Sequence, residues 1–182
     1  MRSVPRPRPA RSAALMLALM LATVPATIAI PTPAHGFYAP SSREVWIGGD
    51  KLYRWRDGMM SDVAYRPESR RSVVELIGGS SPNDVWVASR PASGGVGPVH
   101  LSHWDGKIWR QEPLGPSSKR ATAIAVAGPS DAWLTTDDSL FHWNGASWSV
   151  SAHCPPGCCA SLALTPDAVF LLGDDTIYRR AR

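Results

Sequence analysis

Two histidines stand at matching positions in a near-repeat that carries the side chains of acid–base chemistry. The first is His103, in the segment HLSHWDGKIW, and the second is His142, in the segment SLFHWNGASW. A histidine close to a carboxylate is typical of general bases and of metal sites. A group required by one reaction occurs once, however, whereas a group required by a repeated scaffold recurs. Because the histidine is duplicated, we interpret His103 and His142 as structural.

The first copy of the same pattern, YRWRDG, supports this interpretation, because Arg54 replaces the histidine there. We expect each histidine to connect its strand to a neighbouring turn, through Asp84 for the first and Asp131 for the second. The dipeptides that follow, Asp105-Gly106 and Asn144-Gly145, predict two-residue hairpin turns in which both central residues have positive φ.

Motifs for catalysis or metal binding are otherwise missing from the sequence. It contains no G-x-S-x-G, no H-E-x-x-H, no D-x-D-x-D-G and no glycine-rich phosphate loop. The paired acids Asp137 and Asp138 are echoed by Asp174 and Asp175, which indicates turns. We therefore expect no catalytic residue, no metal ligand and no cofactor. A hydrolase or lyase that uses loop acids stays open as an alternative.

The N-terminal segment has the pattern of a secretory signal peptide. Residues 1–12 contain four arginines, and an uncharged apolar run follows from Ala13 to Ile30. We expect cleavage of residues 1–36, with the mature chain beginning between His35 and Phe37, in a secreted or periplasmic protein. An uncleaved membrane anchor is the alternative.

Removing this segment lowers the basic residues from 19 to 15 and leaves the 15 acidic residues unchanged. The neutral remainder excludes nucleic acid as a partner. It also leaves no reason to expect membrane binding after cleavage.

The cysteines Cys154, Cys158 and Cys159 lie within six residues, which in an exported protein predicts a disulfide from Cys154 to one of the other two. His153 makes a metal site there an alternative.

Residues 37–182 read as one domain of four imperfect repeats, at about 41–65, 72–113, 121–152 and 160–182. Their marker aromatics, Trp46, Trp86, Trp133 and Phe170, are 40, 47 and 37 residues apart. A period near 40 is typical of propellers, and short strand-like runs between turn signals predict four strands in a repeat.

The pattern S-x-x-D-V-W…L-x-H-W-D-G-x-x-W resembles the repeat of secreted bacterial β-propeller proteins, which are loosely related to Kelch and WD-repeat propellers. The resemblance implies an all-β, β-propeller-like fold of about four antiparallel four-stranded blades. We expect it to be incomplete at both ends, with three strands in the first and last repeats. GFYAP (36–40) is the only segment that could complete the first sheet.

The repeat positions hold all eight tryptophans, which we expect in the core together with the two histidines: Trp46, Trp55, Trp86, Trp104, Trp109, Trp133, Trp143 and Trp148. Candidate binding residues lie off the repeat, in loops that a propeller gathers on one face: Arg66, Arg70, Arg71, Arg90, Lys119 and Arg120. Their charge predicts an anionic ligand such as an acidic glycan.

The function that these patterns favour is an exported, non-catalytic binding module that presents its loop face to a glycan, a peptide or an envelope component. A truncated family member without a function of its own is a further alternative. We expect an arc of three to four blades that is either barely closed or completed by a second chain, because open strand edges and exposed apolar faces favour association as a homodimer.

Overall fold

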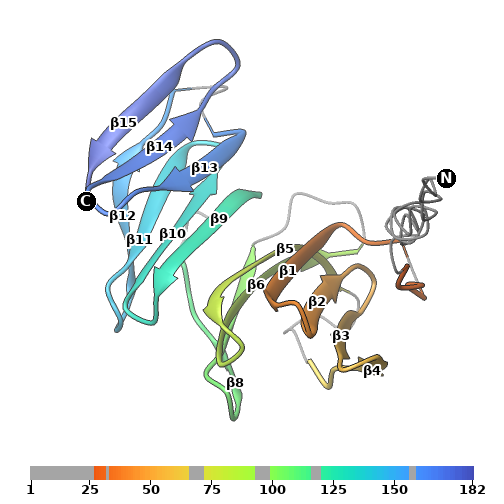
Figure 1. Cartoon of the computed structure of the whole chain (residues 1–182). Helices are drawn as coiled ribbons and strands as arrows, with labels where there is room; N and C mark the ends of the chain where they lie inside the picture. The colour runs from red at the N-terminus through yellow and green to blue at the C-terminus, as the bar shows by residue number, and fades with distance from the viewer. Residues whose placement is uncertain (1–26, 32, 66–71, 93–98, 116–119, 156–158) are drawn as a thin grey trace, which may run out of the picture. The chain divides into compact units, whose positions relative to one another are not determined.

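The computed structural model describes residues 27–31, 33–65, 72–92, 99–115, 120–155 and 159–182. The chain divides into two compact units, Met1–Ile30 and Pro31–Arg182. All fifteen strands belong to the second unit, where they form four antiparallel sheets (Figure 1). The described residues contain no helix, and hence none that could cross a membrane. The predicted all-β fold is confirmed.

Each sheet is a meander in which neighbouring strands follow one another in sequence, and we call each sheet a blade. Blade 1 comprises β1 (Gly36–Ser41), β2 (Glu44–Gly48), β3 (Leu52–Arg56) and β4 (Met59–Asp62). Blade 2 comprises β5 (Ser72–Ser81), β6 (Asp84–Pro91), β7 (His100–Trp104) and β8 (Trp109–Gln111). Blade 3 comprises β9 (Ala121–Gly128), β10 (Asp131–Thr136), β11 (Ser139–Trp143) and β12 (Trp148–His153). Blade 4 comprises β13 (Ser161–Leu164), β14 (Ala168–Leu172) and β15 (Ile177–Ala181).

Blade 1 has one strand more than the sequence predicts, because β1 pairs with β2. The residues of β1 are alternately half-buried and exposed, and the side chain of Tyr38 packs into the core that contains Trp46. At Gly36 the chain passes so close to the next blade that an added Cβ would lie 2.6 Å from the backbone oxygen of Glu75. Glycine is therefore needed at the first position of this strand. Blade 4 has three described strands, as predicted.

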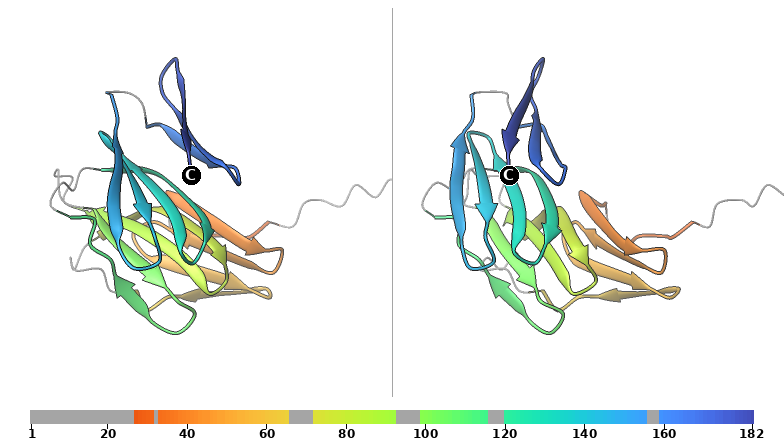
Figure 2. Two further views of the ribbon diagram at one scale, coloured as in Figure 1. Left: turned by 90° about the vertical axis from the view of Figure 1, so that its left-hand side faces the viewer. Right: turned by 60° about the vertical axis from the view of Figure 1, so that its left-hand side comes forward.

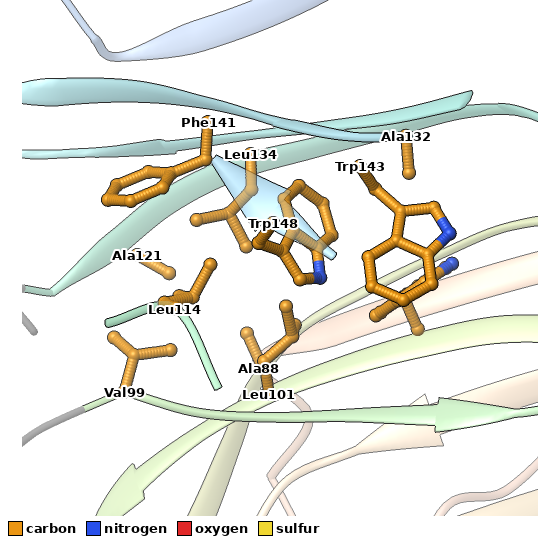
Figure 3. Close-up of a cluster of buried hydrophobic side chains, with 11 residues drawn as sticks. Ala88, Val99, Leu101, Leu114, Ala121, Ala132, Leu134, Phe141, Trp143 and Trp148 are labelled. Carbon is orange, nitrogen blue, oxygen red and sulfur yellow. The ribbon is translucent and has the colours of Figure 1, made fainter. Parts of the chain in front are cut away.

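Three hydrophobic cores join the four blades in chain order. The first lies between blades 1 and 2 around Trp46, and the second lies between blades 2 and 3 around Trp86. The third lies between blades 3 and 4 around Trp133. Figure 3 shows the second core, where Trp143 and Trp148 of blade 3 lie over side chains of blade 2. Packing of blade against blade is thus what buries the apolar side chains of each sheet.

The innermost strands of the blades lie side by side, β1 beside β5, β5 beside β9 and β9 beside β13, as the colour order in Figure 2 also shows. The meander places two kinds of connection at opposite ends of the strands. At the hairpin end, the first strand turns into the second and the third into the fourth. At the loop face, the second strand turns into the third and the chain passes to the next blade.

Both predicted hairpin turns, Asp105-Gly106 in blade 2 and Asn144-Gly145 in blade 3, differ from the prediction. Asp57 and Gly58 both have positive φ, at 48° and 89°, in a two-residue turn between β3 and β4. In blades 2 and 3 only Gly106 and Gly145 have positive φ, and the turns contain four residues. The preceding Asp105 accepts two backbone hydrogen bonds at 2.9 Å, from Lys107 and Ile108. Asn144 does the same in blade 3, so the side chain rather than a mirror-image turn caps each loop.

Candidate functional site

The hairpin end carries the same group in each of the first three blades, an acid with a tryptophan and a cationic or imidazole side chain. In blade 1 the indole nitrogen of Trp46 donates to Glu44 Oε1 at 2.9 Å. Arg54 Nη2 lies 2.8 Å from the same oxygen, and its guanidinium lies 4.8 Å from the centre of the Trp46 ring. The buried carboxylate thereby fixes both the ring and the cation.

The two repeated histidines occupy the place of Arg54 in the next blades. His103 Nε2 lies 2.7 Å from Asp84 Oδ1, and the imidazole stacks on Trp86 at 4.1 Å between ring centres. His142 Nε2 lies 3.1 Å from Asp131 Oδ1 and stacks on Trp133 at 4.2 Å. Both histidines therefore hold their strand to the acid that starts the neighbouring strand.

Blade 4 carries a variant of the group. Arg179 Nη2 lies 3.2 Å from Asp167 Oδ2, and Arg179 is the cross-strand partner of Phe170 in the register of β14 and β15. The aromatic residue follows the acid by three positions rather than two. Phe170 thus stands in the place of the marker tryptophans, as its spacing predicts.

The acids of blades 2 and 3 are held in the ionised form. Burial would raise the pKa of Asp84, but hydrogen bonds from His103 and Ser80 outweigh it and keep that pKa below its ordinary value. Burial would also raise the pKa of Asp131, but hydrogen bonds from Arg182, Trp133 and His142 together outweigh it and keep that pKa below its ordinary value. A carboxylate so committed to acceptor bonds is a structural anchor, and a poor proton donor at neutral pH.

The remaining tryptophans pack mainly between blades. Trp148 of blade 3 lies 5.1 Å from Trp86 of blade 2, and Trp109 of blade 2 lies 5.9 Å from Trp46 of blade 1, both edge to face. A buried indole N–H group usually has a hydrogen-bond partner. Trp143 does, donating to the backbone oxygen of Pro129 at 3.0 Å. Three buried indole nitrogens have no hydrogen-bond partner within the described residues: Trp86, Trp104 and Trp148.

The loop face, in contrast, contains a group that occurs once. A cavity of about 360 Å³ lies where the inner strands begin, and residues of all four blades or their approaches line it: His35, Glu75, Leu76, Arg120, Ala121, Thr122 and Ala160. Glu75 is its acid, and the Glu75 side chain is half-buried. Arg90 Nε lies 2.5 Å from Glu75 Oε1, and Arg120 Nε lies 3.9 Å from the same atom.

Two sequence-predicted binding residues, Arg90 and Arg120, are therefore brought together although thirty positions separate them. The other four predicted residues, Arg66, Arg70, Arg71 and Lys119, lie outside the described residues. Glu75 was missed by the sequence reasoning. The sequence does contain a feature that could have indicated Glu75, because it is the single charged residue in the strand sequence SVVELIGG.

The cysteine segment lies at the loop face near a second cavity, of about 240 Å³, between blades 3 and 4. Cys154 is half-buried and lines this cavity, and Cys159 is buried. Cys158 lies outside the described residues, so the predicted disulfide stays a prediction. No group of three or more potential metal ligands is found in the described part of the chain.

Comparison with known proteins places this geometry among propellers. No family model matches the chain, and no curated protein matches it. Solved structures do match. YCF48 bound to D1 peptide superposes with a TM-score of 0.60 at 16% identity, covering 85% of this chain and 57% of that one. The fold is that of a β-propeller.

Two further structures extend the comparison. YCF48 from Cyanidioschyzon merolae has a TM-score of 0.56 at 14% identity, over 84% of this chain and 58% of that one. The GH74 xyloglucanase from Xanthomonas campestris has a TM-score of 0.52 at 17% identity, over 75% of this chain and 25% of that one. This chain thus spans little more than half of YCF48, and the likeness at these identities concerns the fold alone.

Proposed function

We propose that the protein is an exported, non-catalytic binding module whose loop face binds an anionic group of an extracellular or envelope partner, a glycan or a peptide. The observation that carries the proposal is the placement of Arg90 and Arg120 around Glu75 at the cavity on that face. Export rests on the signal-peptide pattern of residues 1–36.

Of the two described arginines beside Glu75, Arg120 is the one that remains available to a ligand. Arg90 is close to Glu75 and is largely neutralised by it. Arg120 is 3.9 Å from the same oxygen and its side chain is 68% exposed, so it retains donors for another acceptor. A guanidinium binds a carboxylate through two parallel hydrogen bonds, and such charge-assisted bonds are about twice as strong as neutral ones. Arg120 is therefore the predicted contact to the ligand, and Glu75 with Arg90 its positioning partners.

The same geometry favours binding over hydrolysis. Glycoside hydrolysis usually requires two carboxyl groups that flank the scissile bond. Among the described residues lining the cavity, Glu75 is the only carboxylate, and it is committed to arginine. The repeated histidines His103 and His142 lie at the opposite end of the strands, paired with Asp84 and Asp131. His35 does line the cavity, but among the described lining residues it has no second carboxyl group to work with.

The similar structures support both ligand classes. One is bound to the D1 peptide and another is a xyloglucanase. Propeller scaffolds of this kind thus serve peptide binding in one protein and polysaccharide chemistry in another, while the residues at the site determine which applies. For this chain, the charge of Arg120 selects an acidic member of either class.

An array of acidic and neutral glycans, together with peptides that end in a free carboxylate, tests the proposal. We expect acidic probes to bind with a strong salt dependence. Arg120→Ala should weaken binding about 10-fold to 100-fold, the loss of one charge-assisted bond of ~1.5–3 kcal/mol. Its free energy of unfolding should change by less than about 0.5 kcal/mol.

The matched control is Arg43→Ala, which removes an 83% exposed arginine at the hairpin end, where it pairs with Asp57 at 3.4 Å. This variant should bind like the parent chain. Equal affinity of the Arg120→Ala variant, selection of neutral probes, or release of a cleaved product from any probe would each contradict the proposal.

A further inference from the structure

The described part of the chain has four blades but three cores between them, so one face at each end of the series has no blade against it. These two end faces belong to blade 1 and blade 4, the orange and blue sheets of Figure 2. Their inner strands, β1 and β13, do not pack side by side as the other consecutive inner strands do. Within the described residues, the interfaces between blades therefore join blade 1 to blade 2, blade 2 to blade 3 and blade 3 to blade 4.

The end face of blade 4 is built like the faces that other blades bury. In the register of β14 and β15, Phe170 lies opposite Arg179, as Trp133 lies opposite His142 in blade 3. In blade 3 this face packs against the next blade, and Trp133 is 3% exposed. In blade 4 the same face leaves Leu172 48% exposed and Ile177 69% exposed.

The end face of blade 1 is the matching half. Phe37 pairs with Ile47 in the sheet, on the side opposite to Trp46, and Phe37 is 72% exposed. Trp55, the cross-strand partner of Val45, is half-buried on this same side. The corresponding side of blade 3 presents four residues that pack against blade 2: Ala132, Leu134, Phe141 and Trp143. Blade 1 thus has an aromatic surface on the side that, in blade 3, packs against the preceding blade.

A second copy of the chain supplies exactly one of each face. If blade 4 of one copy packs on blade 1 of the other, the two-fold axis repeats the contact and both end faces of both copies are covered at once. Such a head-to-tail contact that closes leaves no free face, whereas one that does not close gives open polymers. Two copies of four blades make eight, within the four to eight blades usual for propellers.

We infer that two copies of this chain associate head to tail, with the Phe170–Ile177 face of blade 4 packed on the Phe37–Trp55 face of blade 1, in a closed ring of eight blades. The inter-blade interface is already present three times in each chain, so the proposal extends an established interface. It is independent of ligand binding at the loop face.

Light scattering coupled to size exclusion, over a range of concentrations, tests the ring. The parent chain should have twice the mass of one chain. Phe37→Arg and Ile177→Arg each introduce a charge on an exposed side chain of one end face, so each variant should fold but run as a monomer. Ile108→Arg, at a 52% exposed position in the hairpin loop of blade 2, should stay dimeric and serves as the control.

Mixing the two interface variants sharpens the test. A mixture of Phe37→Arg and Ile177→Arg chains retains one unaltered interface per pair, so a heterodimer should form although neither variant dimerises alone. A monomeric parent chain, larger open polymers, or a dimer that both substitutions leave intact would each overturn the inference. Because Arg120 lies at neither end face, the Arg120→Ala variant should remain dimeric whatever its affinity for ligand.

Discussion

The hairpin end and the loop face belong to the same four sheets, but their polar residues are distributed by opposite rules. At the hairpin end, an acid, an aromatic ring and a guanidinium or imidazole group recur, as Glu44 with Arg54 and as Asp84 with His103. At the loop face, the group formed by Glu75 and its two arginines occurs once among the described residues. Residues that blade geometry requires must recur in each blade, whereas a ligand contact needs to be made once. Repetition within a chain therefore separates scaffold from site without any alignment.

The largest expected effect comes from removing a ring of the hairpin end. Trp86 is fully buried, stacks on His103 and contacts Trp143 and Trp148 of the next blade. Trp86→Ala should lower the free energy of unfolding by about 3–5 kcal/mol, as large-to-small core substitutions do. Urea denaturation followed by circular dichroism measures this loss. A loss below about 1 kcal/mol would mean that the repeated ring is not a core element.

A smaller effect is expected from the histidine that stacks on this ring. His103→Ala leaves the buried carboxylate of Asp84 without one of its donors, which should cost about 1–3 kcal/mol. The equivalent His142→Ala should cost less, because the His142 side chain is 33% exposed while that of His103 is 12% exposed. Thermal unfolding gives both values. Ligand binding should persist in the folded fraction. Loss of binding at unchanged thermal stability would mean that His103 contacts the ligand and is not only structural.

The smallest effect is a change with pH. The pKa of Asp84 is lower in the folded chain than in the unfolded one, so its ionised form stabilises the fold above about pH 4, the usual value for aspartate. This contribution is lost as the pH falls through the lowered pKa. The stability gap between the parent chain and Asp84→Asn should therefore be present at pH 7 and narrow below pH 4. A gap that is constant over urea denaturations from pH 3 to pH 7 would contradict this.

The sequence predicts the strands and the period well because turn residues and alternating apolar residues act over short distances. Strand β1 escaped prediction for the converse reason. GFYAPS contains glycine and proline, and its place in the sheet is fixed by pairing with β2 and by close approach to the backbone of Glu75. Neither constraint is local, so neither leaves a signal in six residues.

The candidate site was predictable in part for the same reason. The charges of Arg90 and Arg120 mark residues that could bind an anion, and their sequence positions predict that both lie at the loop face, although Arg90 belongs to β6 rather than to a loop. Their meeting point could not be read from the sequence, because it depends on Glu75, which lies 15 residues before one arginine and 45 before the other. The partial burial of Glu75 depends on the assembled inner strands.

The placement of the tryptophans has a consequence for spectroscopy. Seven of the eight indoles pack against blade neighbours or stack at the hairpin end, and Trp55 lies on the end face of blade 1. No tryptophan follows Trp148, so Trp133 alone represents the joint between blades 3 and 4. Intrinsic fluorescence should therefore report separation of the blades, with three tryptophans at each of the first two joints and one at the third. A ligand seated beside Arg120 would leave that emission almost unchanged.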